Sequence, residues 1–426
     1  MKVFQKAANN DFFRHNLVFF VGSVLVGVGN YLFYPVLART LEPLPFGEVQ
    51  ALAALFLQLL ILLNVMGQVT VNVIANYTDE AKKRAVLFEL EKLALLLMLG
   101  VSFVLALCSP ILKDALQFQS IAPFLVLLAA LVITVPGSFR SAFLRAHKKF
   151  GAASIALLIG AYTKVLFGVL LTYLGFQVGG AMWAIFIAQL LTWLYATYAA
   201  KKVGYRRPTT KLFSRPNLKL VLPELKFALL VLVSFGSITL LSSLDVFVVR
   251  YYFDPQTAGE YAGISTVAKI IFFFTASVAQ VMFASIKITA PASANRKLFT
   301  RSLLLTGGLG GIALVIFTLS PDFFVQLLMG QNYVSFAYLL PLLASVMLML
   351  ALLNIAVTYY VALRMYAISI ILVIGLMLVG ILMMLHHNDL RAIITNILFG
   401  CSAIGGSIIV WRIIQLNRKG QHAAIS

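Results

Sequence analysis

Long apolar stretches separated by short polar gaps dominate the chain. A mostly apolar run of about 20 residues is long enough for a helix to cross a bilayer. The chain holds twelve such runs, with centres near residues 27, 61, 97, 129, 163, 189, 237, 273, 311, 345, 375 and 401. Six precede the basic stretch that begins at Lys201, and six follow it. The pattern predicts an all-α polytopic membrane protein with about 12 transmembrane helices.

Two short segments repeat each other at the same place in each half. Leu41-Glu42-Pro43 followed by Gly47-Glu48 matches Phe253-Asp254-Pro255 followed by Gly259-Glu260, with an offset of 212 residues. Each copy follows the first apolar run of its half. Because each half holds an even number of runs, both halves enter the membrane from the same side. We therefore predict two six-helix lobes related by a parallel pseudo-two-fold repeat.

The predicted lobes and their connections follow from the same gaps. They comprise an amino-terminal lobe (1–200), a basic cytoplasmic linker (201–223), a carboxy-terminal lobe (224–411) and a cytoplasmic tail (412–426).

Composition and charge fix the class and the orientation. Hydrophobic residues make up 61% of the chain and charged residues 11%, and the mean hydropathy is +0.97, which is far from a soluble domain. Of the 33 Lys and Arg residues, 26 lie in the gaps on the side of both tails. The opposite gaps hold Arg39, Lys113, Arg250 and Arg391. Positive loops stay inside, so we expect a multi-pass protein of the cell (inner or plasma) membrane with both termini cytoplasmic.

Several function classes are excluded by what the gaps lack. No gap exceeds about 25 residues, so there is no room for a soluble catalytic or nucleotide-binding domain. The chain has no GxxxxGK[ST] phosphate loop, no HExxH and no CxxC. We expect no enzyme activity, no cofactor and no metal site. The net charge of +19 indicates topology and attraction to membrane lipids, and no nucleic-acid partner is expected.

Ionisable side chains inside the apolar runs mark functional sites, and three of them stand out. Lys164 lies near the middle of the fifth run without an acid at its depth, so we expect it to face water or an anion. Lys269 lies nine residues past Glu260 on the eighth run. Asp245 lies near the outer end of the seventh run. Asp245 either forms a buried ion pair with Lys269 or binds a coupling ion, H+ or Na+.

Amide side chains form a stripe on the second run. Asn64, Gln68, Asn72 and Asn76 recur every four residues and share one helical face, which favours the wall of a wet cavity over interhelical contacts alone. Residues with weaker support for the same cavity are Asn30, Gln58, Gln280, Asn354 and Arg364. Arg39 and Arg250 lie near the repeated turns at the outward rim, where they contact headgroups or guide substrate.

A cavity with excess positive charge, few acids and many amides suits an anionic, polyhydroxylated cargo. Lys and Arg attract diphosphate, and amides supply both donors and acceptors to sugar hydroxyls. A cargo with a long lipid tail would keep that tail in the bilayer while its head moves through the cavity, with the two lobes rocking around it.

Two stretches carry a resemblance to a known family. They are GNYLFYPVLARTLEPLPFGEVQALAAL at 29–55 and LDVFVVRYYFDPQTAGEYAGISTVAKII at 244–271. The chain resembles the Wzx-like polysaccharide flippases of the multidrug/oligosaccharidyl-lipid/polysaccharide exporter superfamily, whose first and seventh helices end in such segments. With twelve runs and a near-halved duplication, the resemblance covers essentially the whole chain.

The resemblance implies a function and partners. The function is translocation of a polyprenyl-diphosphate-linked oligosaccharide (an O-antigen, capsule or exopolysaccharide unit) from the cytoplasmic to the outer leaflet by alternating access. It also implies ion-gradient coupling, and a polysaccharide polymerase and a chain-length regulator as partners.

Three other functions stay open at this point. A MATE-type multidrug or cation antiporter should place carboxylates in its cavity, and here only Asp245 qualifies. Peptidoglycan-precursor flippases of the same superfamily usually have fourteen spans. A membrane-embedded polysaccharide polymerase or acyltransferase should present a large outward loop. The outward polar cluster of His386, His387 and Asp389 lies in a very short turn, where a solvated loop is the favoured interpretation.

Overall fold

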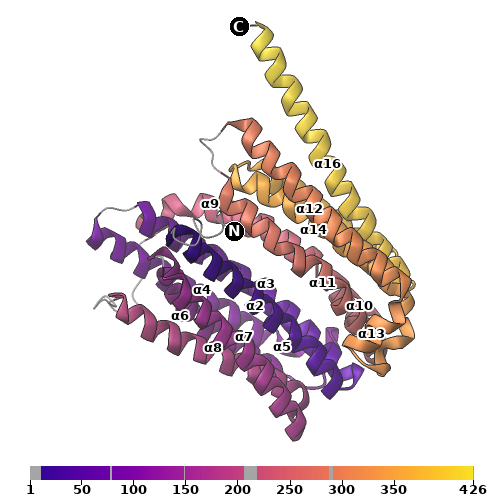
Figure 1. Ribbon diagram of the computed structural model, residues 1–426. Helices are drawn as coiled ribbons and strands as arrows, with labels where there is room; N and C mark the ends of the chain where they lie inside the picture. Colours follow the sequence, from indigo (N-terminus) through magenta and orange to yellow (C-terminus); the bar gives the residue numbers. More distant parts are fainter. Residues whose placement is uncertain (1–10, 77–78, 148, 206–217, 287–290, 426) are drawn as a thin grey trace, which may run out of the picture. The chain divides into compact units, whose positions relative to one another are not determined.

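The computed structural model describes residues 11–76, 79–147, 149–205, 218–286 and 291–425, and these ranges are helical with no strand (Figure 1). Two compact units, Met1–Ala228 and Leu229–Ser426, divide the chain. The division falls inside a helix, α9 (Leu218–Leu241), beyond the predicted linker 201–223. Residues 206–217 of that linker lie outside the described ranges.

The first unit is built from long apolar helices that follow the predicted runs. Its helices are α2 (Asp11–Thr40), α3 (Pro43–Asn76), α4 (Glu80–Leu107), α5 (Ser109–Ala115), α6 (Ala122–Ala146), α7 (Phe150–Leu171) and α8 (Gln177–Lys202). α7 packs against both α2 and α8, and α6 packs against α8, α3 and α4. Gly160 allows α7 to lie close to Thr192 of α8, because a Cβ on this glycine would meet the threonine hydroxyl.

The second unit repeats this order of long and short helices. It contains most of α9, then α10 (Leu244–Tyr252), α11 (Pro255–Ser285), α12 (Ala292–Leu319), α13 (Pro321–Leu328), a 3-10 segment η2 (Gln331–Leu339), α14 (Leu340–Ala362), α15 (Ala367–Leu385) and α16 (Leu390–Ile425). α14 lies at the centre of the packing, where it contacts α11, α12 and α16. α15 packs mainly against α16.

Three pairs of corresponding helices begin at the same spacing in the two units. α3 and α11, α4 and α12, and α5 and α13 begin 212 residues apart, at Pro43 and Pro255, Glu80 and Ala292, and Ser109 and Pro321. This is the offset of the two repeated sequence segments. The spacing supports a duplicated chain, and the pseudo-two-fold relation stays a prediction.

All twelve predicted centres fall inside helices, but the seventh run is not one straight helix. Ala228–Leu241 and Leu244–Tyr252 are bent by 48° relative to each other. Ser242 and Ser243 donate hydrogen bonds to the carbonyl oxygen of Thr239, at 2.7 and 3.3 Å. Such side-chain bonds compete with the backbone ladder and bend helices.

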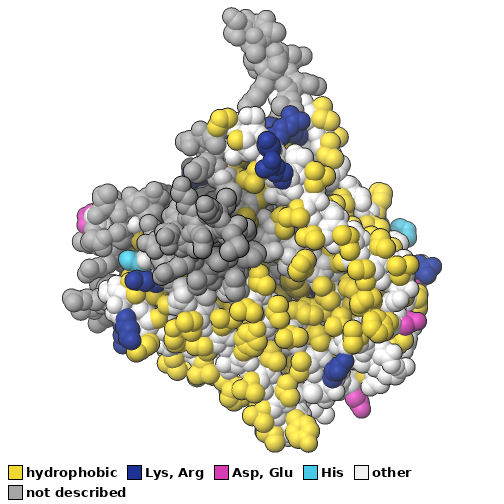
Figure 2. Space-filling view, in the orientation of Figure 1, with side chains coloured by type: hydrophobic (Ala, Val, Ile, Leu, Met, Phe, Trp, Pro, Cys, Tyr) yellow, Lys and Arg dark blue, Asp and Glu magenta, His cyan; other side chains and the backbone are white. Residues whose placement is uncertain are grey.

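The long helices suit a bilayer. Among the described residues, nine stretches are long and apolar enough to cross a membrane, or ten if the bent pair forms one span. One of the nine, Phe150–Lys202, contains both α7 and α8, which are separated by a turn at Gly175 with φ +90°. The face shown in Figure 2 is largely hydrophobic with few charged side chains, as lipid contact requires. The protein is therefore a multi-pass membrane protein, and its predicted number of twelve spans stays a prediction.

Candidate functional site: buried charges in each unit

Lys164 lies in the middle of α7, where its ammonium group is held by α2. The Nζ atom donates a hydrogen bond to Asn30 Oδ1 at 3.0 Å. It also lies 4.6 Å from the ring centroid of Phe33 and 5.9 Å from that of Tyr34. Within the described part of the chain, no carboxylate pairs with this lysine. The structure thus brings together two predicted site residues, Lys164 and Asn30, and adds an aromatic surface that the sequence analysis did not foresee.

Asp245 forms the polar centre of the second unit. It is 1% exposed, and its Oδ2 atom accepts hydrogen bonds from Ser265 Oγ at 2.6 Å and Tyr261 OH at 3.1 Å. Its Oδ1 atom lies 4.0 Å from Lys269 Nζ and has no hydrogen-bond partner in the described structure. Of the two predicted arrangements, the buried ion pair is the one present. A role in ion coupling stays a prediction.

The two rim arginines differ in their surroundings. Arg39, in the last turn of α2, is exposed as expected. Arg250, in the last turn of α10, is only 1% exposed and is therefore buried. The expected contact between Arg250 and lipid headgroups does not fit this burial, because a headgroup contact requires an exposed side chain.

The predicted amide stripe on α3 is described only in part. Asn64 is exposed, and Gln58 is half-buried with its Nε2 atom buried and without a partner in the described structure. The side chains of Gln68, Asn72 and Asn76 lie outside the described residues. The remaining weaker candidates are Gln280 and Arg364, which are exposed, and Asn354, which is half-buried.

Sequence analysis missed a buried polar cluster in the first unit. Arg140 of α6 forms an ion pair with Glu91 of α4, and both side chains are buried. Tyr205, which follows α8, donates a hydrogen bond to Glu91 Oε2 at 3.2 Å, and its ring centroid lies 4.8 Å from Arg140 Cζ. We call these three residues the Glu91 cluster. Glu91 and Arg140 are an acid and a base at the ends of two separate apolar runs, which is a sequence signal for an ion pair. The periodicity of apolar residues does not show which faces of two helices contact each other, so the sequence did not identify this pair.

The acids of the repeated segments have local roles. Glu48 is 1% exposed, and its Oε1 atom accepts a hydrogen bond from the backbone N–H of Gln119 at 2.8 Å, which ties α3 to the loop after α5. Glu260 accepts a hydrogen bond from Gln256 Nε2 at 2.9 Å on the same helix. Asp254 caps the first turn of α11 by accepting hydrogen bonds from the N–H groups of Gln256 and Thr257.

The histidine cluster that the sequence predicts to face outward has structural contacts. The ring of His387 stacks on Tyr252 at a centroid distance of 3.8 Å. Asp389 accepts a hydrogen bond from the N–H of Ala392 at the start of α16. Among the residues that the structure describes, no group of three or more His, Cys, Asp or Glu is placed to hold a metal ion. This arrangement gives no support to the polymerase or acyltransferase alternative.

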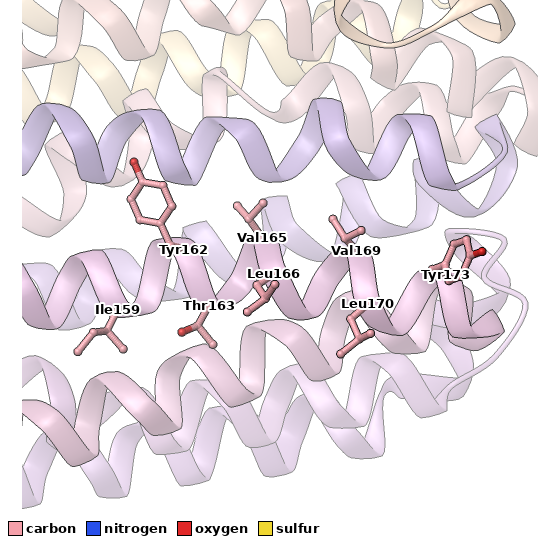
Figure 3. Close-up of a pocket in the computed structure, with 8 residues that line it drawn as sticks. All are labelled: Ile159, Tyr162, Thr163, Val165, Leu166, Val169, Leu170 and Tyr173. Atoms are coloured by element: carbon pink, nitrogen blue, oxygen red, sulfur yellow. The ribbon is translucent and has the colours of Figure 1, made fainter.

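An open groove of about 710 Å³ runs along the outer face of α7 (Figure 3). Its lining is almost entirely apolar, from Ile159 to Leu170, with Tyr173 beyond the helix end. Lys164 is two residues from both Tyr162 and Leu166 of this lining, and at about 100° per residue it points to the opposite side of α7. The groove therefore suits lipid chains and does not include the lysine.

Comparisons with known proteins agree with this architecture. Among curated protein sequences, no significant match to the chain was found. An inward-facing multidrug resistance MATE family transporter of the MOP superfamily is similar in fold, with a TM-score of 0.72 and 16% identity over 93% of this chain and 96% of that chain. Lipid II flippase MurJ, in an inward closed conformation, gives a TM-score of 0.70 and 14% identity over 93% of this chain and 87% of that chain.

A further similar structure is a MOP superfamily transporter from Pyrococcus furiosus, with a TM-score of 0.61 and 16% identity over 95% of each chain. At these identities the likeness shows the fold alone. The sequence profile of the family described as "Polysaccharide biosynthesis protein" matches residues 14–286, which is more than half of the chain. The chain therefore belongs to the polysaccharide biosynthesis protein family, with the fold of MOP superfamily transporters.

Proposed function

We propose that this protein is a flippase that moves a polyprenyl-diphosphate-linked oligosaccharide from the cytoplasmic to the outer leaflet by alternating access. Family membership and fold make it a flippase-like membrane transporter of polysaccharide biosynthesis. MurJ, which has a similar fold, is a flippase of another lipid-linked molecule, lipid II. Beyond this, we propose the identity of the cargo, the direction in which it moves and the coupling of transport to an ion gradient.

The observation that carries the proposal is the environment of Lys164. A cation in the middle of an apolar helix needs a compensating group, because an isolated charge is costly in lipid. Asn30 supplies one hydrogen bond and Phe33 a ring face, but neither supplies negative charge. An ammonium group has further N–H donors, and diphosphate oxygens are strong acceptors for them. Lys164 is therefore suited to bind the diphosphate of the cargo, and the amides of α3 to bind its sugars.

The Asp245–Lys269 pair is proposed as the coupling element. The free Oδ1 atom of Asp245 and the 4.0 Å gap to Lys269 Nζ leave room for this carboxylate to exchange partners. Binding of H+ or Na+ at Asp245 would release Lys269, which would then be available to an anion. Both termini are proposed to be cytoplasmic, and a polymerase and a chain-length regulator are proposed partners in the cell membrane.

A MATE-type exporter is the second candidate, because a MATE transporter has a TM-score of 0.72 to this chain and Asp245 is a buried acid. For the Pyrococcus furiosus transporter, a reversed polarity of the binding pocket suggested a different function. In the present protein two buried acids, Glu91 and Asp245, each lie beside a base, whereas no acid lies beside Lys164 in the described structure. This balance favours an anionic cargo over a cationic drug.

Reconstitution in liposomes tests the proposal. The purified protein is combined with a fluorescent polyprenyl-diphosphate oligosaccharide, and an impermeant quencher reads the fraction in the outer leaflet over time. We expect the protein to accelerate exchange between leaflets, and a cationic dye to show no protein-dependent flux. Dye flux without lipid exchange would instead identify a MATE-type exporter.

A further inference from the structure

The two arginines of α6 have different electrostatic environments. Arg140 lies against the carboxylate of Glu91 and the ring of Tyr205. Arg145, five residues later in the last turn, forms no ion pair with any described residue. Its Nε atom is buried and has no hydrogen-bond partner in the described structure. An arginine cannot release its proton to relieve the cost of burial, so it needs an anion.

Arg145 is directed toward the amide-bearing helix. Its Nη2 atom lies 3.4 Å from the position that a Cβ on Gly67 of α3 would occupy. Gly67 is three residues beyond the exposed Asn64, and residues at this spacing are neighbours on a helix surface. The uncompensated guanidinium group therefore lies beside the face of α3 on which the sequence places its amide stripe.

The position along the bundle complements that of Lys164. Arg145 is the second-last residue of α6. It lies at the end of this helix that the charge distribution predicts to be cytoplasmic. Lys164 is fourteen residues into α7, which begins at Phe150, and is therefore about 21 Å deeper along that helix. In the described part of the first unit, two cations therefore lack an acid, Arg145 at the end predicted to be cytoplasmic and Lys164 halfway along.

We propose that Arg145 is a phosphate-binding residue at the cytoplasmic entrance of the first unit. It binds a lipid-anchored phosphate group before that group moves to Lys164. The inference rests on the proposed flippase function for the identity of the cargo. A lipid-anchored phosphate group has two sources in a membrane: the diphosphate of the polyprenyl-linked cargo and the headgroup phosphate of an anionic phospholipid. A planar guanidinium binds phosphate oxygens in pairs, so arginine is preferred over lysine at this position.

Equilibrium binding with the full-length protein in nanodiscs tests the inference. The probe is a labelled polyprenyl diphosphate, with phosphatidylglycerol as the competing lipid in a phosphatidylcholine background. We expect Arg145→Gln to weaken polyprenyl diphosphate binding at least tenfold and Arg145→Lys to weaken it less. The matched control is Lys149→Gln, which removes an exposed positive charge at the same end and should change the affinity less than twofold.

The competition identifies the source of the phosphate. Phosphatidylglycerol that displaces the probe from the wild type but not from Arg145→Gln supports a site shared with phospholipid headgroups. Failure to displace it supports a site selective for the diphosphate. Binding by Arg145→Gln that equals the wild type for both lipids would overturn the inference.

Thermal unfolding separates binding from structure. Because Arg145 has no ion-pair partner among the described residues, Arg145→Gln should keep the melting temperature of the wild type, whereas Arg140→Gln should lower it by leaving Glu91 unpaired. An equal loss of stability in both variants would assign Arg145 a structural role and contradict the inference. A wild-type protein that binds the probe but does not flip it would contradict the proposed function and leave the inference standing.

Discussion

At the scale of single residues, the chain distributes its few buried charges unevenly. Glu91 with Arg140 and Asp245 with Lys269 are paired within their units. Lys164 has a neutral hydrogen-bond acceptor and an aromatic ring in place of an acid. A buried ion pair is weak evidence for function, since such pairs also serve structure. A cation in the middle of an apolar helix that lacks an acid in the described structure is stronger evidence for an anionic ligand.

Replacing Lys164 by Ala should abolish transport while the protein still folds and reaches the membrane. Among the described residues, the side chain makes one hydrogen bond, to Asn30, so its loss costs little stability but removes the proposed diphosphate contact. Flipping is measured in liposomes, and folding by size-exclusion chromatography. Lys164→Arg keeps the charge and should retain partial activity. Normal flipping by Lys164→Ala would remove this residue from the mechanism.

Asp245 and Lys269 should be energetically coupled. Asp245→Ala leaves the buried Lys269 without its acid and should reduce the free energy of unfolding by about 3–5 kcal/mol. The double variant with Lys269→Ala removes both charges and should be less destabilised than Asp245→Ala alone. Denaturation of the four proteins in detergent gives the coupling energy. Additive effects of the two changes would contradict an energetically important pair.

Exchanging the two residues separates pairing from ion coupling. The variant Asp245→Lys with Lys269→Asp preserves opposite charges at both positions. If the pair only supports the fold, this variant should transport at a substantial fraction of the wild-type rate. If Asp245 binds H+ or Na+ among the hydroxyls of Tyr261 and Ser265, the exchange should abolish gradient-driven transport.

At the scale of elements, the turns that join helices carry the most specific sequence signals. Asp254 precedes Pro255, the first residue of α11, and its Oδ1 atom accepts the N–H groups of Gln256 and Thr257 at 3.1 and 3.0 Å. This is an N-cap with proline in the first helical position, both of which favour a helix start. The repeated acid and proline therefore mark a helix boundary, which explains why they recur at the structural start of α11.

The cap of α11 should be sensitive to pH. Hydrogen bonds from Thr257, from its side chain and then its backbone, hold the pKa of Asp254 below its ordinary value. The stabilisation is therefore fully present above about pH 3.9 and is lost as the pH falls through the lowered pKa. Asp254→Ala should cost about 1 kcal/mol at neutral pH. Asp254→Asn retains the cap without titrating, so thermal unfolding of this control should lose the corresponding pH dependence.

The Glu91 cluster should anchor the chain at the end of α8. Tyr205 is held by Glu91 and Arg140, and its ring also contacts Phe143 at a centroid distance of 5.2 Å. Tyr205→Ala should therefore accelerate tryptic cleavage after the exposed Lys201 and Lys202 at least severalfold. Tyr205→Phe keeps the ring contacts and should change the rate less. Equal cleavage of Tyr205→Ala and the wild type would contradict the anchoring role.

The sequence was sufficient to locate the helices but not to determine their contacts. Apolar runs predict where a helix can cross a bilayer, and every predicted centre lies in a helix. The short helices α5 and α13 were not predicted, because they are too short to form a periodic apolar signal. The bend between α9 and α10 was also missed, since Ser242 and Ser243 are compatible with either a straight or a bent helix.

For the candidate site, the sequence likewise identified residues but not their contacts. Depth along a helix identified Lys164, Lys269 and Asp245, because burial of charge can be read from position in an apolar run. The partners were harder to predict, since Asn30 lies on another helix and its contact depends on how α2 packs against α7. For the same reason, sequence alone did not distinguish Arg140, which pairs with Glu91, from Arg145, which has no ion pair among the described residues.

At the scale of the whole molecule, each of the two units contains a buried acid–base pair among its described residues, and the first also contains Arg145 and Lys164, which have no acid beside them there. In the proposed mechanism the first unit binds the diphosphate, at Arg145 and then at Lys164. The second unit responds to the ion gradient through Asp245 and Lys269. A division of this kind predicts that variants in the first unit reduce binding, whereas Asp245 variants leave binding intact and reduce gradient-driven movement.

The most direct test of this account is the leaflet distribution of lipid-linked oligosaccharide in cells depleted of the protein, read with an impermeant probe of outward-facing sugar. The account predicts that the oligosaccharide accumulates on the cytoplasmic face and that wild-type protein, but not Lys164→Ala, restores it to the outer face. A normal distribution in depleted cells, together with altered drug sensitivity, would contradict the flippase function and support a MATE-type exporter.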